Sequence, residues 1–268
     1  MRSFVPPVRD QQCACGGVDH VDDISLRLVE IHSAVSVFAN ALVAAGQLLL
    51  TADATLSEIT LLSLRVSATA TLIAALLGLP LGAWVALTGS RLRLPTVVVL
   101  NASMGLPPVV VGLVVYLLLS RSGVMGPLGW LFTPAGMVMA QTILITPIIA
   151  ALSRQTIEDA HLSLRDWFNS LGLSATQRVA TLLFEARFSL AVVLLAGFGR
   201  AIAEVGAVMI VGGNISGSTR VMTTTIALET SKGDLPLALA LGALLVALVL
   251  IINGVAQWLK AWLEQQRG

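Results

Sequence analysis

Long apolar runs alternate with short polar connections over most of this 268-residue chain. Five of the runs are close to the length of about 20 residues that an α-helix needs to cross a bilayer. They cover residues 66–88, 96–119, 135–152, 188–211 and 235–258. A sixth run, 33–50, is shorter and is interrupted by Asn40 and Gln47, so it either spans the membrane or lies along the interface. The pattern predicts an all-α polytopic membrane protein with five core transmembrane helices and one further N-terminal helix.

A polar segment, residues 154–187, separates the third and fourth core runs. Thr156, with Asp159 three positions later, resembles a helix N-terminal cap, and Gly172 is a typical C-terminal stop. Between them, apolar residues recur at helical spacing and form one stripe: Ile157, Ala160, Leu164, Trp167, Phe168 and Leu171. The pattern predicts an amphipathic helix whose stripe rests either on the membrane surface or in a groove of a partner protein.

Composition supports a membrane protein, because 56% of the residues are hydrophobic and only 12% are charged. A soluble domain carries about 25% charged residues. The net charge of +1 gives no reason to expect a nucleic-acid partner. Residues 1–30 are rich in acidic side chains and lack the pattern of a signal peptide, so we expect a disordered extension. Its cysteines, Cys13 and Cys15, are too close in sequence for an ordinary disulfide and have no second pair with which to bind zinc.

Basic residues are distributed unequally between the two sets of connections. One set carries eight of them: Arg91, Arg93, Arg154, Arg165, Arg178, Arg187, Lys260 and Arg267. The other set carries three: Arg121, Arg220 and Lys232. The positive-inside rule therefore predicts that the polar segment and the C-terminus face the cytoplasm.

Two ionisable residues lie inside an apolar run. Arg200 and Glu204 are four residues apart and so share one helix face. Such groups by default face a bundle interior or a water-filled cavity, so the two form either a gate in the pathway or a structural ion pair. Further candidates for lining the pathway or its mouth follow in the sequence: Gly206, Gly212, Gly213 and Asn214. Thr223, Thr224 and Thr225 either donate hydroxyl groups to an oxyanion or bond to their own backbone. We identify no catalytic or metal-binding residues.

The polar segment resembles the cytoplasmic loop of the permease subunits of binding-protein-dependent ABC importers. That loop carries Glu-Ala-Ala, three further residues and Gly, and later Ile-x-Leu-Pro. When Gly172 is set on the family glycine, the first motif falls on Asp166, Trp167 and Phe168, and the second on Leu182, Phe184 and Glu185. The strings GRAIAEVGAVMIVGGNI and ALETSKGD are similar to tungstate-importer permeases, and molybdate permeases share these themes more loosely.

The resemblance implies that residues 31–264 form a single transmembrane domain of the cytoplasmic (inner) membrane, with a coupling helix between the third and fourth core spans. It implies that two copies of the chain enclose the pathway and that two ATP-binding cassette subunits grip the coupling helices. A periplasmic or lipid-anchored binding protein would deliver the oxyanion.

The sequence has no GxxxxGK[ST] loop, so we expect ATP and Mg on the partner subunits, and neither a cofactor nor enzymatic activity in this chain. The leading interpretation is a tungstate permease. The alternatives are a molybdate or sulfate permease of the same class, or a self-sufficient anion channel or secondary transporter.

Overall fold

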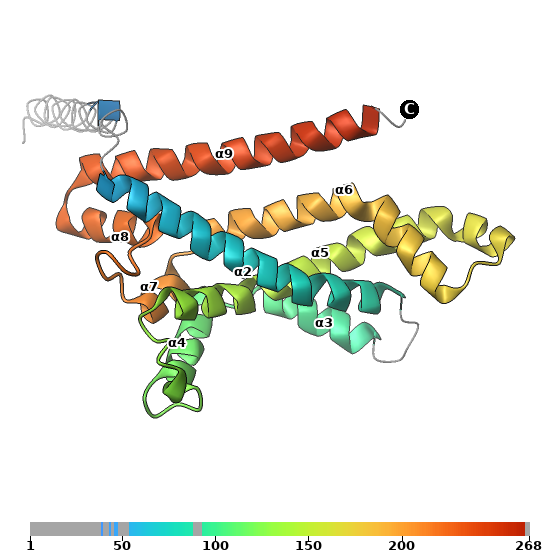
Figure 1. The fold of residues 1–268 in the computed structure, drawn as a ribbon, viewed down its shortest axis with the longest axis horizontal. Helices are drawn as coiled ribbons and strands as arrows, with labels where there is room; N and C mark the ends of the chain where they lie inside the picture. The colour runs from blue at the N-terminus through green and yellow to red at the C-terminus, as the bar shows by residue number, and fades with distance from the viewer. Residues whose placement is uncertain (1–38, 40–42, 44–45, 48–53, 88–92, 266–268) are drawn as a thin grey trace, which may run out of the picture.

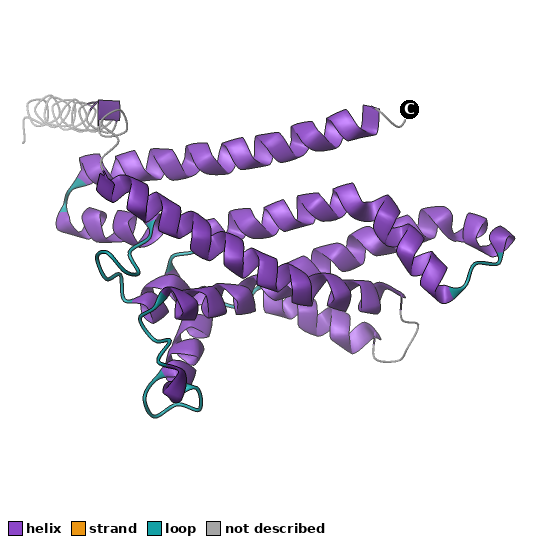
Figure 2. Cartoon of the chain, viewed as in Figure 1, coloured by secondary structure: helices purple, strands orange, loops and turns teal. Residues whose placement is uncertain are grey.

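A computed structural model of the chain describes residues 54–87 and 93–265, together with the single positions 39, 43, 46 and 47. The predicted extension 1–30 lies outside the described residues. Only four positions of the segment 33–50 are described. The described residues form helices joined by short connections, without a strand among them (Figure 2). In chain order the helices are α2 (Ala54–Leu87), α3 (Arg93–Met104), α4 (Pro108–Leu119), the 3₁₀ turn η1 (Gly126–Leu128), α5 (Pro134–Leu171), α6 (Ala175–Ile202), α7 (Gly206–Gly212), α8 (Met222–Lys232) and α9 (Leu235–Gln265).

Four long helices, α2, α5, α6 and α9, run along the longest axis of the molecule (Figure 1). Each is long and apolar enough to cross a membrane, and α3 with α4 makes a fifth such span if the bent pair is counted as one. The prediction of an all-α polytopic membrane protein is confirmed.

The predicted single span 96–119 is broken into two helices. α3 and α4 meet at an angle of 97° across the residues Gly105–Pro107. Pro107 is extended, with φ −63° and ψ 123°, and Pro108 is the first residue of α4. A proline has no N–H for the helix ladder and pushes the residue before it out of helical conformation, so two in succession end α3.

The polar segment differs from its prediction in one respect. No separate helix begins at Thr156, because α5 runs without a break from Pro134 to Leu171. The Thr156 hydroxyl donates to the Leu152 carbonyl one turn earlier at 2.9 Å, a bond that a threonine makes inside a helix. The predicted stop at Gly172 is confirmed, since this residue follows α5 in the left-handed conformation, with φ 60° and ψ 30°.

Two glycines bring α2 and α5 into backbone contact. A Cβ atom on Gly78 would lie 3.0 Å from the Thr146 carbonyl oxygen, and one on Gly82 would lie 2.5 Å from that of Ala150. The buried Ser153 hydroxyl, which also lies against Gly82, donates to the Gly78 carbonyl at 3.5 Å. Small residues four positions apart allow such close approach in lipid, where helices gain nothing by burying apolar surface from each other.

We expect Gly82→Ala to lower the melting temperature of the purified protein, because α2 must move away from the α5 backbone to admit the methyl group. Overpacking of this kind costs about 1–3 kcal/mol. Thermal unfolding of the detergent-solubilised chain, followed by circular dichroism, measures the effect. The matched control is Gly242→Ala in α9, where nothing lies within 4 Å of an added Cβ. Equal melting temperatures for the two variants would contradict the close contact.

Candidate functional site

Arg200 and Glu204 form an ion pair at the end of α6. Arg200 Nη1 donates to Glu204 Oε2 at 2.6 Å. Only 4% of Glu204 is exposed, whereas the Arg200 side chain is 41% exposed. The two residues that sequence spacing placed on one face therefore lie together, with a buried carboxylate holding a partly accessible guanidinium.

The helix breaks beside this pair. The predicted span 188–211 is not continuous, since α6 ends at Ile202 and α7 begins at Gly206. Glu204 stands at the break, and its Oε1 accepts a bond from the Ala207 N–H in the first turn of α7 at 3.3 Å. The acidic side chain thus satisfies an N–H group that the break leaves without a helical partner. No proline marks this break in the sequence, so apolar periodicity alone predicted a continuous helix.

Side chains from two other helices bind the carbonyl groups at the break. Gln141 Nε2 of α5 donates to the Ala201 carbonyl at 2.9 Å. The Thr223 hydroxyl of α8 donates to the Glu204 carbonyl at 2.8 Å. Because the surroundings are apolar, carbonyls freed from a helix need such partners. Side chains of α5 and α8 therefore hold the break between α6 and α7, so long-range contacts specify it.

A narrow polar space adjoins the break. Ser63 and Ser67 of α2 line it together with Gln141, Glu204 and Thr223. Within the described chain, no group donates to the buried Oε1 of Gln141. Sequence reasoning missed Gln141 and the two serines, and the one signal available was a lone amide in the apolar run 135–152. Arg200 is not among the residues that line this space, but it lies with Gln141 and Glu204 around a small adjoining space.

The glycines near the break are positions of close packing. An added Cβ on Gly206 would lie 2.9 Å from Val109 Cγ2 of α4, and one on Gly212 would lie 2.9 Å from Met137 Sδ of α5. Gly213 ends α7 in the left-handed conformation with φ 69°. Of these three, only Gly206 lies beside the ion pair, with Glu204 Oε1 3.7 Å from its added Cβ. A pathway role for them stays a prediction.

Asn214 lies in the connection that follows α7, and its side chain bonds to Thr224 of α8. Its Oδ1 accepts from the Thr224 hydroxyl at 3.0 Å, and its Nδ2 donates to the Thr224 carbonyl at 3.4 Å. Thr225 bonds back to the Val221 carbonyl at 2.7 Å. Of Thr223, Thr224 and Thr225, only Thr223 therefore directs its hydroxyl to the break.

The predicted apolar stripe on the polar segment is divided between two environments. Ile157 and Phe168 are buried inside this chain, among Leu182, Ala186 and Leu190 of α6. Ala160 and Leu164 are half-buried at the edge of the same cluster. The expectation that the whole stripe is available to a surface or partner is therefore wrong, because α6 folds back over this face of α5.

Two residues of the stripe remain exposed at the tip of the segment: Trp167 is 52% exposed and Leu171 is 53% exposed. Asp166 beside them is also exposed. The tip is held by a capping box, in which the Gln177 N–H donates to Ser174 Oγ and the Ser174 N–H donates to Gln177 Oε1. Sequence reasoning missed this box, although a serine followed by glutamine three residues later is its signature.

An ion-pair network ties the base of the segment to α3. Glu158 forms ion pairs with two arginines, one at each carboxylate oxygen. Arg93 Nη2 lies 2.7 Å from Glu158 Oε1, and Arg154 Nη1 lies 2.6 Å from Glu158 Oε2. The network joins the start of α3 to the part of α5 that leads to the exposed tip.

Comparison with known proteins identifies the family. Residues 78–267 match the model of the family described as binding-protein-dependent transport system inner membrane component. A probable anion ABC transporter permease protein of Haloferax volcanii is 42% identical over 205 residues, which cover 75% of this chain and 88% of the relative. The tungstate uptake system permease protein TupB of Peptoclostridium acidaminophilum is 41% identical over 212 residues, covering 79% and 93%. The molybdenum transport system permease protein ModB of Azotobacter vinelandii is 29% identical over 184 residues, covering 62% and 76%.

The family match begins in α2 and includes the polar segment, the Arg200–Glu204 pair and both broken spans. Of the polar groups at the break, Ser63 and Ser67 precede the matched region, whereas Gln141, Glu204 and Thr223 lie within it. The apolar helices agree with a multi-pass protein of the inner membrane. The chain belongs to the binding-protein-dependent transport system inner membrane components, the permease subunits of ABC importers.

Proposed function

We propose that this permease carries tungstate through a pathway that two copies of the chain enclose. The observation that carries the proposal is Arg200, a partly exposed cation held by a buried carboxylate where a membrane-spanning helix breaks. A guanidinium in this position attracts a dianion, and its pairing with Glu204 keeps the attraction moderate. An ion in a pathway must also leave its site, so a moderated charge suits transport better than a tight trap.

The choice of tungstate rests on the relatives. Those named for tungstate uptake are 41% and 39% identical to this chain, whereas those named for molybdenum transport are 24% to 29% identical. Molybdate is the second candidate, since both ions are tetrahedral dianions. Membership of the family weighs against a self-sufficient channel or secondary transporter.

The partners follow from the family. Binding-protein-dependent importers use ATP-binding and substrate-binding subunits. We place ATP and Mg on two ATP-binding cassette subunits and expect a periplasmic or lipid-anchored binding protein to deliver the oxyanion. The eight-to-three distribution of basic residues supports an orientation with the polar segment and the C-terminus in the cytoplasm.

The exposed tip of the polar segment is our candidate for ATPase contact. Trp167 and Leu171 present apolar surface one turn apart, and the buried Phe168 fixes the helix beneath them. Large, rigid aromatic side chains on a supported helix are typical anchors of an interface. The bulk of Trp167, where the family motif has alanine, therefore lies where a partner groove would receive it.

The exposed apolar face of α4 is an argument for a second copy of the chain. Its outer face exposes Val109, Val110, Leu113, Val114 and Leu117. This helix leaves α3 at 97° and packs on the described chain through the opposite face, where Val111 and Val115 are buried. Four or five spans enclose little space alone, and two-fold closure by an identical subunit is the common solution.

We expect tungstate uptake by membrane vesicles that contain this permease, its ATPase subunit and its binding protein, measured as accumulated tungsten. Uptake should require ATP, because the permease gains the energy for accumulation through its partner. Tungstate uptake that continues without the ATPase subunit would contradict the proposed function. A preference of the vesicles for sulfate over tungstate would contradict it as well.

In the same vesicles, Trp167→Asp should abolish uptake and ATPase co-purification while the permease keeps its melting temperature. The added charge lies at the exposed tip, where it disrupts docking and leaves the buried cluster intact. The control is Val124→Asp, which adds the same charge to a residue that is 88% exposed outside the polar segment. Normal ATPase co-purification with Trp167→Asp would remove this residue from the interface.

Substitutions at Arg200 and Glu204 separate a structural from a pathway role. Arg200→Gln should reduce folded yield strongly, because it leaves the buried Glu204 without its cation; breaking such a pair costs about 3–5 kcal/mol. Glu204→Gln should cost less, since Arg200 is partly exposed. The double variant has no uncompensated charge and should recover folding.

Uptake by the double variant decides the role. We expect it to stay at least about tenfold below wild type, the loss that follows from removing a hydrogen bond to a charged group. Gel filtration and the melting temperature serve as the folding controls. A double variant that folds and transports at the wild-type rate would show that the pair is only structural.

A further inference from the structure

A second polar cavity lies at the other end of the molecule from the polar segment. Its volume is about 460 Å³, and it opens between the first half of α2 and the connection from α7 to α8. In Figure 1 these elements lie at the left end of the long helices, whereas the turn between α5 and α6 lies at the right end. The cavity is therefore far from the exposed tip, and its lining residues differ from those of the polar space at the Arg200–Glu204 break.

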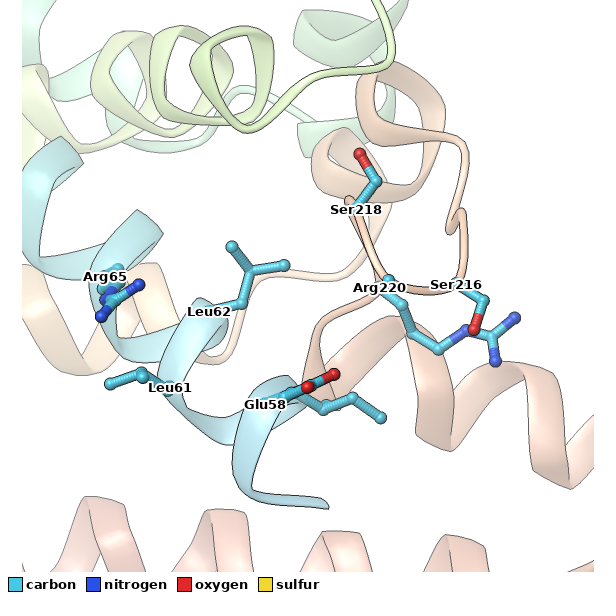
Figure 3. A pocket seen from close by; sticks show the side chains of 9 residues that line it. Glu58, Leu61, Leu62, Arg65, Ser216, Ser218 and Arg220 are labelled. Atoms are coloured by element: carbon cyan, nitrogen blue, oxygen red, sulfur yellow. The ribbon is translucent and has the colours of Figure 1, made fainter. Parts of the chain in front are cut away.

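Two arginines are among the residues that line this cavity. Glu58 and Arg65 are seven residues apart, which places them on one face of α2, and Arg220 comes from the connection opposite. Ser216 and Ser218 add two hydroxyl groups from the same connection. Figure 3 shows Arg65 and Arg220 on opposite sides of the view, with the Glu58 carboxylate between them. With two arginines and one glutamate, the residues that line the cavity carry a net charge of +1.

The arginines keep hydrogen-bonding capacity for a ligand. Neither Arg65 nor Arg220 forms an ion pair within the part of the chain that the structure describes. The Nε atom of Arg220 is buried there without an acceptor. A buried donor without a partner is costly, and an oxygen of a bound anion would remove that cost. A guanidinium also matches a tetrahedral oxyanion, because it donates two parallel bonds.

The connection that carries Arg220 is held in one shape. The buried Thr219 hydroxyl donates to the Gly212 carbonyl at 2.5 Å and accepts from the Ile215 N–H at 3.0 Å. The Arg220 N–H adds a bond to the Ile215 carbonyl at 3.1 Å. The two serines and the arginine are therefore presented on a preformed turn, which lowers the entropy lost when a ligand binds.

Both walls of the cavity continue to the polar break. On α2, the buried Ser63 and Ser67 are each two residues from the exposed Arg65, so they lie on the opposite side of the helix, where they line the space beside Glu204. The turn with Arg220 leads into α8, where Thr223 bonds to the Glu204 carbonyl. The Met222 N–H donates to Ser63 Oγ at 2.9 Å and joins the two walls. The same two elements thus carry the residues of the cavity and the residues of the polar space at the break.

We propose that this cavity binds a tetrahedral dianionic oxyanion at the outer mouth of the permease, before the ion passes to Arg200. Its position on the outer side rests on the proposed function and the proposed orientation. Arg65, Arg220 and the two serine hydroxyls bind the oxygens. Glu58 repels the ion, which keeps its residence short enough for onward transfer.

The test measures tungstate binding to the permease–ATPase complex, without binding protein, in phosphatidylcholine nanodiscs. Bound tungsten is counted after equilibrium dialysis. We expect Arg65→Gln and Arg220→Gln each to weaken binding about tenfold, as the loss of a charge-assisted bond implies. Glu58→Gln should tighten binding, because it removes a like charge. The control is Lys232→Gln, a cation that already pairs with Glu229 at 2.8 Å and does not line the cavity.

Effects of opposite sign at Arg65 and Glu58 identify this cavity, since general damage to the fold weakens binding in every variant. Wild-type affinity in both arginine variants, or weaker binding in Glu58→Gln, would overturn the proposal. So would loss of tungstate binding when anionic phosphatidylglycerol replaces part of the phosphatidylcholine, because a lipid phosphate would then be the occupant. If the wild-type complex transports tungstate and the cavity variants keep its KM, only this inference fails; if the wild type transports no tungstate, the proposed function fails.

Discussion

A backbone group freed from a helix inside an apolar protein needs a hydrogen-bond partner, and this requirement organises the centre of the molecule. α6 ends at Ile202 because Glu204 caps α7 while Gln141 and Thr223 bind the carbonyls left open. The polar groups that close the break are also those that the proposed function assigns to the pathway. On that proposal, structural stability and a polar pathway have one origin.

The second broken span completes this centre. The short helices that follow the two breaks, α4 and α7, pack against each other so closely that a Cβ on Gly112 would lie 2.7 Å from Ala207 Cα. Buried Val111 and Val115 on α4 and Val211 on α7 belong to one apolar core with α5. α5 also carries the polar segment at its far end and is bound to α2 through Gly78 and Gly82. One helix thus connects the break with the exposed tip around Trp167.

Local patterns in the sequence predicted what depends on neighbouring residues. Apolar runs gave the helices and the membrane class, spacing brought Arg200 to Glu204, and Gly172 marked the end of α5. The start expected at Thr156 was wrong because a threonine hydroxyl bonds equally well inside a helix. The break after Ile202 and the burial of Phe168 depend on contacts from distant helices, which no local pattern records. Gln141 escaped notice for the same reason, since one amide in an apolar run has no repeat.

The central claim is that water and ions reach the break between α6 and α7. Val205 lies at this break and is 38% exposed, whereas Val246 on α9 is 58% exposed on an apolar surface suited to lipid. Each is replaced by cysteine in a chain whose Cys13 and Cys15 are serine, and the reconstituted complex is treated with a charged, membrane-impermeant thiol reagent. A thiol reacts as its hydrated thiolate. We predict that Val205→Cys reacts and that tungstate slows the reaction, while Val246→Cys stays unmodified despite its greater exposure. An unreactive Val205→Cys would contradict a hydrated pathway at the break.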